Sequence, residues 1–240
     1  MSAPPEDADV ETASLGYAKR FDSAVGRWML ETQLGLTMDL LSDLVSPTVL
    51  DVGGGHGQIA PALAVTGSAV TVLASNNEAV AVTLRPMIDA GGVALLIGPL
   101  RTPPVEPKSF DVVVSYRLLA HAHDVPALIK ALTEPARKAV LVDYATSRSF
   151  NALAELLFAA KKKVESNTRP FLVMKDGEIE KLFRANGFKR QARRPQFFWP
   201  MALHRALNSR SLSRSLENVT GAVGLRALFG SPVIARFDRV

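Results

Sequence analysis

The sequence has no cysteine among its 240 residues, which excludes disulfides and thiolate metal sites. It also has no uninterrupted apolar run long enough to span a bilayer. The first eleven residues are acidic and contain proline, whereas a signal peptide begins with basic residues. We therefore expect a cytoplasmic protein in which residues 1–12 form a disordered tail.

Two common nucleotide-binding motifs are also absent. Glycine occupies four of the five positions from 53 to 57, but the sixth position counted from Gly53 is Gln58. The dinucleotide fingerprint requires glycine there, so it is excluded. Neither Gly-Lys-Ser nor Gly-Lys-Thr follows the turn, which excludes a P-loop as well.

The glycine-rich stretch is nevertheless the strongest signal in the sequence. It follows a short apolar run over residues 48–52, rich in β-branched residues, which is typical of a strand buried on both faces of a parallel sheet. Glycines allow the backbone to turn sharply and to approach a ligand closely. A helical pattern begins at Gln58, and the first turn of a helix presents unpaired N–H groups. The pattern predicts a ligand-binding turn at the end of a first strand.

Strand and helix patterns alternate along the chain after this turn. Further strands are expected over residues 69–73, 93–97, 110–115 and 139–143, with helices over 78–90 and 125–133. Two later strands, 188–194 and 232–237, are expected to pair antiparallel at an edge of the sheet. Residues 200–220 between them are expected to form two short helices. The alternation predicts an α/β fold with a doubly wound, mostly parallel, seven-stranded sheet that binds its ligand beyond the strands' carboxyl ends.

Basic residues are concentrated in the C-terminal third of the chain. Residues 160–240 contain 17 Lys and Arg against 6 Asp and Glu, whereas residues 1–159 contain 11 against 17. An excess of this size suggests an anionic partner: a membrane surface, a phosphorylated substrate or nucleic acid. A solvated basic surface is an equally good interpretation.

Several stretches together resemble one enzyme family. The pattern Asp51-x-Gly53-x-Gly55-x-Gly57 resembles the first motif of class I S-adenosylmethionine (SAM)-dependent methyltransferases. Residues 109–115, SFDVVVS, resemble the fourth strand of that family, and residues 118–121, LLAH, resemble the segment after it. Gly187-Phe188 before a late strand is also a feature of the family. The resemblance implies a Rossmann-like methyltransferase fold, SAM as the cofactor, and cofactor contacts by Asp51, Gly53, Gly54, Gly55, Gly57 and Ser115.

Within that resemblance, the chain is expected to form a single domain over residues 13–240. Residues 13–46, helical with a break near Gly26, form an N-terminal cap, and residues 47–145 form the cofactor-binding core. Residues 146–240 add substrate-side helices over 150–164 and 176–186, the helical insertion near the C-terminus and the last strands.

The sequence departs from the family pattern at two positions that contact SAM. The family ends its second strand with an acid for the ribose hydroxyls, where this chain has Ala74. The family follows its third strand with Gly-Asp for the adenine amino group, where this chain has Pro99 after the glycine. We expect Ser75 or Asn76 to replace the ribose contact and backbone groups at Leu100 to meet adenine. The loss of two charge-assisted hydrogen bonds predicts a cofactor affinity lower by about ten- to a thousand-fold.

The resemblance implies that SAM supplies the electrophilic methyl group. The protein then has to align the reactants and remove the proton of the acceptor. An acceptor hydroxyl needs a base, and His121 after the fourth strand is the first candidate, with His123 and Tyr116 as second choices. A structural histidine that caps the loop before Pro126 is the other interpretation of His121. Two imidazoles and Asp124 on one loop are weak support for a metal site, and we expect none.

The acceptor side is expected to combine aromatic walls with cations. Such a mixture suits a lipophilic small molecule with an anionic group. It could also stack nucleotides, but the basic residues are scattered over several elements and no RNA-binding appendage is visible. The residues expected to line this pocket are Thr168, Arg169, Phe171, Phe197, Phe198, Trp199 and Arg205. Three aromatic residues ahead of the first strand could cover the cofactor or serve for packing: Tyr17, Phe21 and Trp28.

The sequence therefore predicts a SAM-dependent methyltransferase that acts on a small, hydrophobic acceptor, with O-methylation preferred. Two alternatives stay open. Ala74 and Pro99 favour a degenerate methyltransferase fold that serves as a binding or partner subunit or catalyses a non-methylating reaction. The basic C-terminal region favours RNA methylation, or a peripheral membrane contact in which Arg210 and Arg214 lie opposite an apolar helical face.

Overall fold

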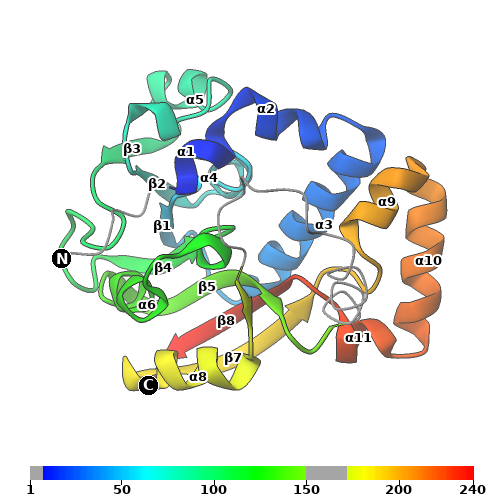
Figure 1. Ribbon diagram of the computed structural model, residues 1–240. Helices are drawn as coiled ribbons and strands as arrows, with labels where there is room; N and C mark the ends of the chain where they lie inside the picture. The colour runs from blue at the N-terminus through cyan, green and yellow to red at the C-terminus, as the bar shows by residue number, and fades with distance from the viewer. Residues whose placement is uncertain (1–7, 150–171) are drawn as a thin grey trace.

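A mostly parallel β-sheet forms the centre of the structure, a computed structural model that describes residues 8–149 and 172–240 (Figure 1). The strands lie in the order β3-β2-β1-β4-β5-β8-β7, and the short strand β6 pairs with β5 outside that path. The strands are β1 (Thr48–Val52), β2 (Ala69–Ala74), β3 (Ala94–Ile97), β4 (Phe110–Ser115), β5 (Ala136–Thr146), β6 (Val173–Met174), β7 (Phe188–Pro195) and β8 (Val233–Arg239).

The strand pairing confirms the doubly wound arrangement expected from the sequence. Strand β1 pairs parallel with both β2 and β4, so the strand before the glycine-rich turn is central in the sheet. Strand β8 pairs antiparallel with β5 and with β7, as predicted for the last two strands. The chain order reverses beside β1, which is where open α/β sheets bind ligands. Sequence reasoning missed β6 because two residues are too few to show a period.

Helices cover both faces of the sheet. Helices α6 and α8 pack on one face through Leu128, Leu132 and Phe183, and α3 and α4 pack on the other through Leu40 and Leu63. In the described ranges, no helix is both long and apolar enough to cross a membrane. The helices are α1 (Ala8–Ala13), α2 (Leu15–Ala18), α3 (Ala24–Leu40), α4 (Ala60–Val65), α5 (Arg85–Asp89), α6 (Val125–Thr133), α8 (Asp176–Ala185), α9 (Met201–Leu207), α10 (Arg210–Ala222) and α11 (Leu225–Phe229). The 3₁₀ turns of the described ranges are η1 (Lys19–Phe21), η2 (Gly54–His56), η3 (Asn77–Ala79) and η4 (Leu119–His121).

The N-terminal segment differs from its sequence-based prediction. The disordered tail expected over residues 1–12 is wrong for residues 8–12, which lie in helix α1 with Asp9 and Thr12 buried; residues 1–7 lie outside the described residues. Tertiary contacts order this helix, and its local composition shows none of them. The helical break expected near Gly26 lies slightly earlier, at Asp22 and Ser23, and Ser23 caps the start of α3 by accepting the N–H of Gly26. A Cβ on Gly26 would lie 2.4 Å from Phe21 Cα, so glycine permits close packing there.

Two later helical predictions have different outcomes. The helix expected over residues 78–90 is reduced to α5, because the chain makes a 3₁₀ turn at η3 and then extends at Val80. The two short helices expected over residues 200–220 are confirmed as α9 and α10, with the break at Asn208 in a left-handed conformation (φ 44°). The helix expected over residues 150–164 lies outside the described residues.

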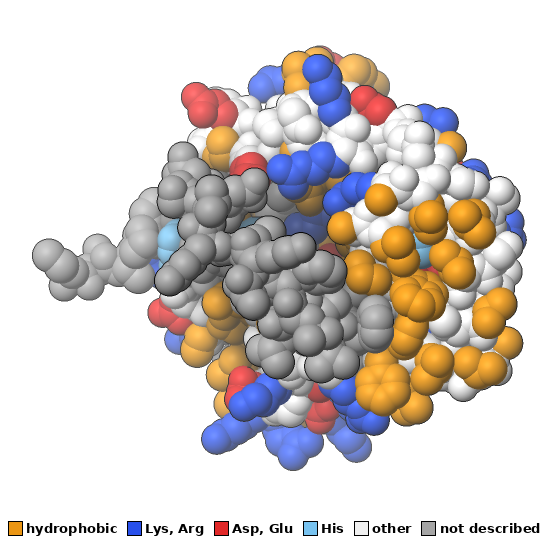
Figure 2. All heavy atoms as spheres, turned by 45° about the vertical axis from the view of Figure 1, so that its right-hand side comes forward, with side chains coloured by type: hydrophobic (Ala, Val, Ile, Leu, Met, Phe, Trp, Pro, Cys, Tyr) orange, Lys and Arg blue, Asp and Glu red, His pale blue; other side chains and the backbone are white. Residues whose placement is uncertain are grey.

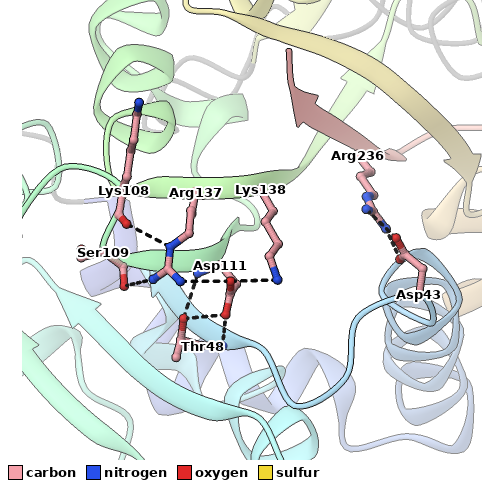
Figure 3. A network of polar contacts seen from close by, with 8 residues as sticks. All are labelled: Asp43, Thr48, Lys108, Ser109, Asp111, Arg137, Lys138 and Arg236. Atoms are coloured by element: carbon pink, nitrogen blue, oxygen red, sulfur yellow. Dashed lines mark hydrogen bonds and ion pairs between the residues drawn. The ribbon is translucent and has the colours of Figure 1, made fainter.

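A polar network fixes the amino-terminal ends of β1 and β4 (Figure 3). Thr48 donates its N–H and its hydroxyl to Asp111 Oδ2, each at 3.1 Å, and its Oγ1 accepts the N–H of Asp111 at 2.8 Å. Lys138 and Arg137 reach the other carboxylate oxygen at 3.1 and 3.5 Å. The backbone hydrogen bond from Thr48 is the main reason that the pKa of Asp111 lies below its usual range. Asp111 is therefore a structural residue at the end of the strands opposite the glycine-rich turn.

Candidate functional site

The glycine-rich turn leaves the carboxyl end of β1 as the 3₁₀ turn η2. Gly53 (φ 73°) and Gly57 (φ 68°) flank η2 in left-handed conformations that favour glycine. Gly53 donates its N–H to the carbonyl oxygen of Leu73 at 2.8 Å, which ties the turn to β2. A Cβ on Gly55 would lie 1.7 Å from the carbonyl oxygen of Ala79 in η3. The chain's own close packing therefore requires glycine in this turn.

Two titratable side chains at the turn are buried. Burial raises the pKa of Asp51 to about 7, although the charge of Arg117 acts in the opposite direction. Burial, helped by the same charge, lowers the pKa of His56 to about 3. His56 Nδ1 accepts the N–H of Gln58 at 3.2 Å, so the proton of the neutral ring lies on Nε2. The turn thus carries a neutral imidazole and a carboxyl group that titrates near neutral pH.

Several buried polar atoms around the turn have no hydrogen-bond partner among the described residues. They are Asp51 Oδ2, His56 Nε2, Ser75 Oγ and Arg117 Nη1. Buried polar groups are almost always paired in folded proteins, so a cluster of unpaired ones indicates a place where a polar ligand binds. Donors and acceptors are both present, which fits SAM with its ammonium, carboxylate and ribose hydroxyl groups.

Arg117, which sequence reasoning missed, is the cation beside this turn. Its backbone is left-handed (φ 64°), a conformation that is strained for a residue with a Cβ. Asp143 Oδ1 accepts its N–H at 2.5 Å, and Gln33 Oε1 accepts a guanidinium hydrogen at 3.1 Å. These contacts from β5 and α3 hold the guanidinium where its charge acts on Asp51 and His56. An arginine two residues after the fourth-strand motif was the one signal available in the sequence.

Three arginines converge on two aromatic rings next to the turn. Arg117 Cζ lies 4.8 Å from the ring centre of Phe21 and 5.4 Å from that of Tyr17. Arg20 lies 4.9 Å from the ring of Tyr17, and Arg205 lies 5.9 Å from that of Phe21. Burial lowers the pKa of Arg205, and the charges of Arg20 and Arg117 add to the effect. We call Arg20, Arg117 and Arg205 the arginine cluster; it combines three segments that are far apart in the sequence.

Two predicted cofactor residues use their side chains within the chain. The Ser115 hydroxyl is buried and donates to the carbonyl oxygen of Val52 at 3.0 Å, which joins the ends of β4 and β1. Asn76 Oδ1 accepts the N–H of Glu78 at 2.8 Å and so caps η3. Both residues lie at the carboxyl ends of the strands, as expected, but these polar atoms already have structural partners.

Two other residues predicted to contact the cofactor, Ser75 and Leu100, face helix α1. The Ser75 N–H donates to Asp9 Oδ2 at 2.7 Å, and Leu100 belongs to the apolar cluster that also contains Ala8. Sequence reasoning placed residues 8 and 9 in a disordered tail and therefore could not foresee their contact with the site.

His121, the candidate base, ends the turn η4 that follows β4. Its N–H donates to the carbonyl oxygen of Leu118 at 3.0 Å, and the Leu118 side chain lies 3.5 Å from the position that a Cβ on Gly53 would take. Turn η4 therefore borders the glycine-rich turn. Tyr116 does not suit the role of a base, because its buried hydroxyl bonds to Thr37 at 2.8 Å and burial raises its pKa well above the usual range.

The loop that follows carries the other titratable candidates. His123 is exposed, and Asp124 caps α6 by accepting the N–H of Ala127 at 3.0 Å. Across residues 8–149 and 172–240, no group of three or more His, Asp or Glu side chains is placed to hold a metal ion.

Of the aromatic residues expected for the acceptor pocket, Phe197 and Phe198 are buried and Trp199 is half-buried. Phe197 is buried with its ring centre 5.2 Å from that of Trp28. The buried carboxylate of Glu217 accepts the N–H of Phe198 at 2.9 and 3.0 Å and that of Trp199 at 2.9 Å. This contact from α10 turns the segment inward, and no local pattern could show it. Outside the described residues lie the other candidates of this pocket, Thr168, Arg169 and Phe171.

The chain is similar to known methyltransferases in sequence and in structure. Residues 50–138 match the family model described as a methyltransferase domain, and no curated protein sequence matches the chain. One similar structure is magnesium protoporphyrin IX methyltransferase from Synechocystis with bound S-adenosylhomocysteine (SAH). It superposes with a TM-score of 0.66 and 15% identity, over 95% of this chain and 96% of that chain.

Two further structures show the same fold. The protein solved in complex with the Trm112 methyltransferase activator of Haloferax volcanii has a TM-score of 0.64 and 17% identity, over 97% of both chains. The Burkholderia thailandensis 1,6-didemethyltoxoflavin-N1-methyltransferase has a TM-score of 0.59 and 12% identity, over 100% of this chain and 93% of that chain.

The doubly wound sheet with a glycine-rich turn after β1 defines a Rossmann-like methyltransferase fold. The sequence match over residues 50–138 covers β1 to β4, the strands that carry this turn. Residues 50–138 therefore form a methyltransferase domain, and similar structures with this fold were solved with bound SAM or SAH.

Proposed function

We propose that the protein transfers the methyl group of SAM to an oxygen atom of a small, lipophilic acceptor that carries an anionic group. The observation that carries this proposal is the arginine cluster on the rings of Tyr17 and Phe21, beside the buried Asp51 and His56. Aromatic faces with converging cations suit an apolar molecule with a carboxylate or a phosphate.

In this proposal, SAM supplies a methyl group on a positively charged sulfur, and the chain's residues bind and align the reactants. Asp51, Ser75 and the glycines of the turn hold the cofactor. The arginine cluster pairs with the anionic group of the acceptor, while Tyr17 and Phe21 pack against its apolar body. His121 would accept the proton of an acceptor hydroxyl, whose oxygen would take the methyl group while its bond to sulfur breaks and SAH leaves.

The ion pairs of the C-terminal region support a small acceptor over RNA. Five arginines there already pair with acids of the same chain, which reduces the charge left to neutralise phosphates. The pairs are Arg190 with Glu180, Arg193 with Asp176, Arg194 with Asp39, Arg210 with Glu31, and Arg236 with Asp43.

The surface of α10 and α11 supports a peripheral membrane contact, which would bring a lipophilic acceptor to a cytoplasmic enzyme. Hydrophobic side chains gather on this side of the molecule in Figure 2. Sedimentation with anionic and zwitterionic vesicles tests the contact, and a protein that stays in the supernatant with both contradicts it. The exposed apolar residues, between 36% and 67% accessible, are Leu212, Val219, Val223, Leu225, Leu228 and Phe229.

Methyl transfer from labelled SAM to aryl carboxylates that carry a hydroxyl, and to the matching amides, tests the acceptor class. We expect transfer to the carboxylates, and Arg205→Gln should raise their KM about tenfold, because a charge-assisted hydrogen bond is replaced. The KM of the neutral amides should not change. Lys19→Gln, which removes an exposed charge next to the cluster, is the control. Equal use of amides and carboxylates, with no effect of Arg205→Gln, would refute the role of the cluster.

A further inference from the structure

Helix α1 lies directly over the glycine-rich turn (Figure 1). It packs on η2, which forms the turn, and on η3, the segment after β2. Two of its residues are almost completely hidden, since Ala8 is 4% and Asp9 is 1% exposed. A six-residue helix is not stable alone, so these contacts with the site are what order it.

Asp9 contacts two parts of the expected cofactor site. Its Oδ2 accepts the N–H of Ser75 at 2.7 Å, directly after Ala74, where the acid for the ribose is missing. Its Cβ lies 3.7 Å from the position that a Cβ on Gly53 would take. The Asp9 side chain thus contacts Ser75 and lies beside Gly53, two residues at which the sequence analysis expects the cofactor.

The adenine side of the site is filled in the same way. Ala8 belongs to the apolar cluster that includes Leu73 and Leu100, and Leu100, the expected adenine contact, is 1% exposed. A side chain that lines a cavity large enough for water keeps part of its surface accessible. Asp9 and Leu100 are each only 1% exposed, so no such cavity lies next to either side chain. An adenosine group is far larger than water and has no room there while α1 is docked.

We propose that α1 is an intramolecular competitor of the cofactor, which occupies the adenosine part of the site and leaves when SAM binds. The inference rests on the proposed position of the cofactor. While α1 is docked the site is closed, so the apparent Kd equals the intrinsic Kd divided by the open fraction. The segment after α1 carries Tyr17 and Arg20, so release of α1 also repositions part of the acceptor site.

Asp9→Ala tests the competition directly. The substitution removes a charge-assisted hydrogen bond from the docked state, so we expect SAH to bind about ten- to a hundred-fold more tightly in calorimetry. Glu11→Gln is the matched control, because it removes the same charge from an exposed position of the same helix. Its Kd for SAH should equal that of the unmodified protein.

Hydrogen exchange of residues 8–18 in the unmodified protein gives a second, independent measurement. Saturating SAH should increase exchange there, because the helix is released. Weaker SAH binding by Asp9→Ala together with slower exchange would overturn the proposal and make Asp9 a cofactor ligand. An unchanged Kd in Asp9→Ala would also overturn it. If neither protein bound SAH at millimolar concentration, the proposed cofactor position itself would be wrong. Binding with the same Kd in both proteins would refute only the competition by α1, so the two failures are distinguishable.

Discussion

Asp51→Asn is expected to stabilise the protein at high pH while it weakens cofactor binding. The Asp51 side chain is buried at the end of β1, where its carboxyl lies so close to Gly54 that a Cβ there would be 2.0 Å away. Burial raises its pKa to about 7 from an ordinary value of 3.8. Asparagine has the same shape but never ionises, so the substitution removes the cost of a buried charge and little else.

The sign and size of the effect follow from proton linkage. A carboxyl with a raised pKa in the folded state contributes stability that is complete below pH 3.8 and is lost as the pH rises through about 7. The difference between the two pKa values corresponds to about 4 kcal/mol, at 1.36 kcal/mol per unit. The variant should therefore match the unmodified protein near pH 4 and exceed its free energy of unfolding by up to about 4 kcal/mol at pH 8.5.

Urea unfolding of both proteins between pH 4 and pH 8.5 measures this difference. His56, whose pKa is lowered to about 3, and Asp143, whose pKa burial raises to about 6, titrate in both proteins, so the comparison cancels their contributions. Asp89→Asn, at an exposed acid on α5, is the control and should run parallel to the unmodified protein. A constant difference between Asp51→Asn and the unmodified protein over the whole range would refute the reasoning. SAH affinity should fall in the same variant, a common conflict between stability and function at binding sites.

Four further substitutions test the packing and the polar contacts of the fold. Gly55→Ala should lower the free energy of unfolding by about 2 kcal/mol or more and abolish SAH binding, because its Cβ would lie 1.7 Å from the Ala79 carbonyl oxygen. Gly177→Ala, with nothing within 4 Å of the new Cβ, should be neutral or stabilising by up to about 1 kcal/mol in the same urea titration. Glu217→Ala should cost about 3 kcal/mol or more in thermal unfolding, because it leaves two consecutive N–H groups buried without an acceptor; an unchanged Tm would contradict that role. Asp111→Asn should cost about 1–2 kcal/mol at pH 7, and because its pKa is lowered the difference should shrink as the pH falls below 3.8; a pH-independent difference would argue against it.

The sequence by itself determined the sheet and the class of the protein. Six of the seven predicted strands follow from short runs that contain β-branched residues, and the turn after the first follows from glycine spacing, both of which are local properties. The resemblance to SAM-dependent methyltransferases likewise depended on residues close together in the chain, and the family match over residues 50–138 confirms it. Arg205 was predicted as an acceptor residue, and the structure brings it to Phe21, although its role stays a prediction.

Only the tertiary structure decided what surrounds the turn. Asp9 lies in an acidic, proline-containing stretch that locally favours disorder, yet its carboxylate meets Ser75, 66 positions away in the sequence. Arg117 joins Arg20 and Arg205 because strand order, helix packing and a left-handed backbone place the three side chains together. Contacts between distant segments depend on how whole elements pack, and a period or a motif in one stretch does not encode them.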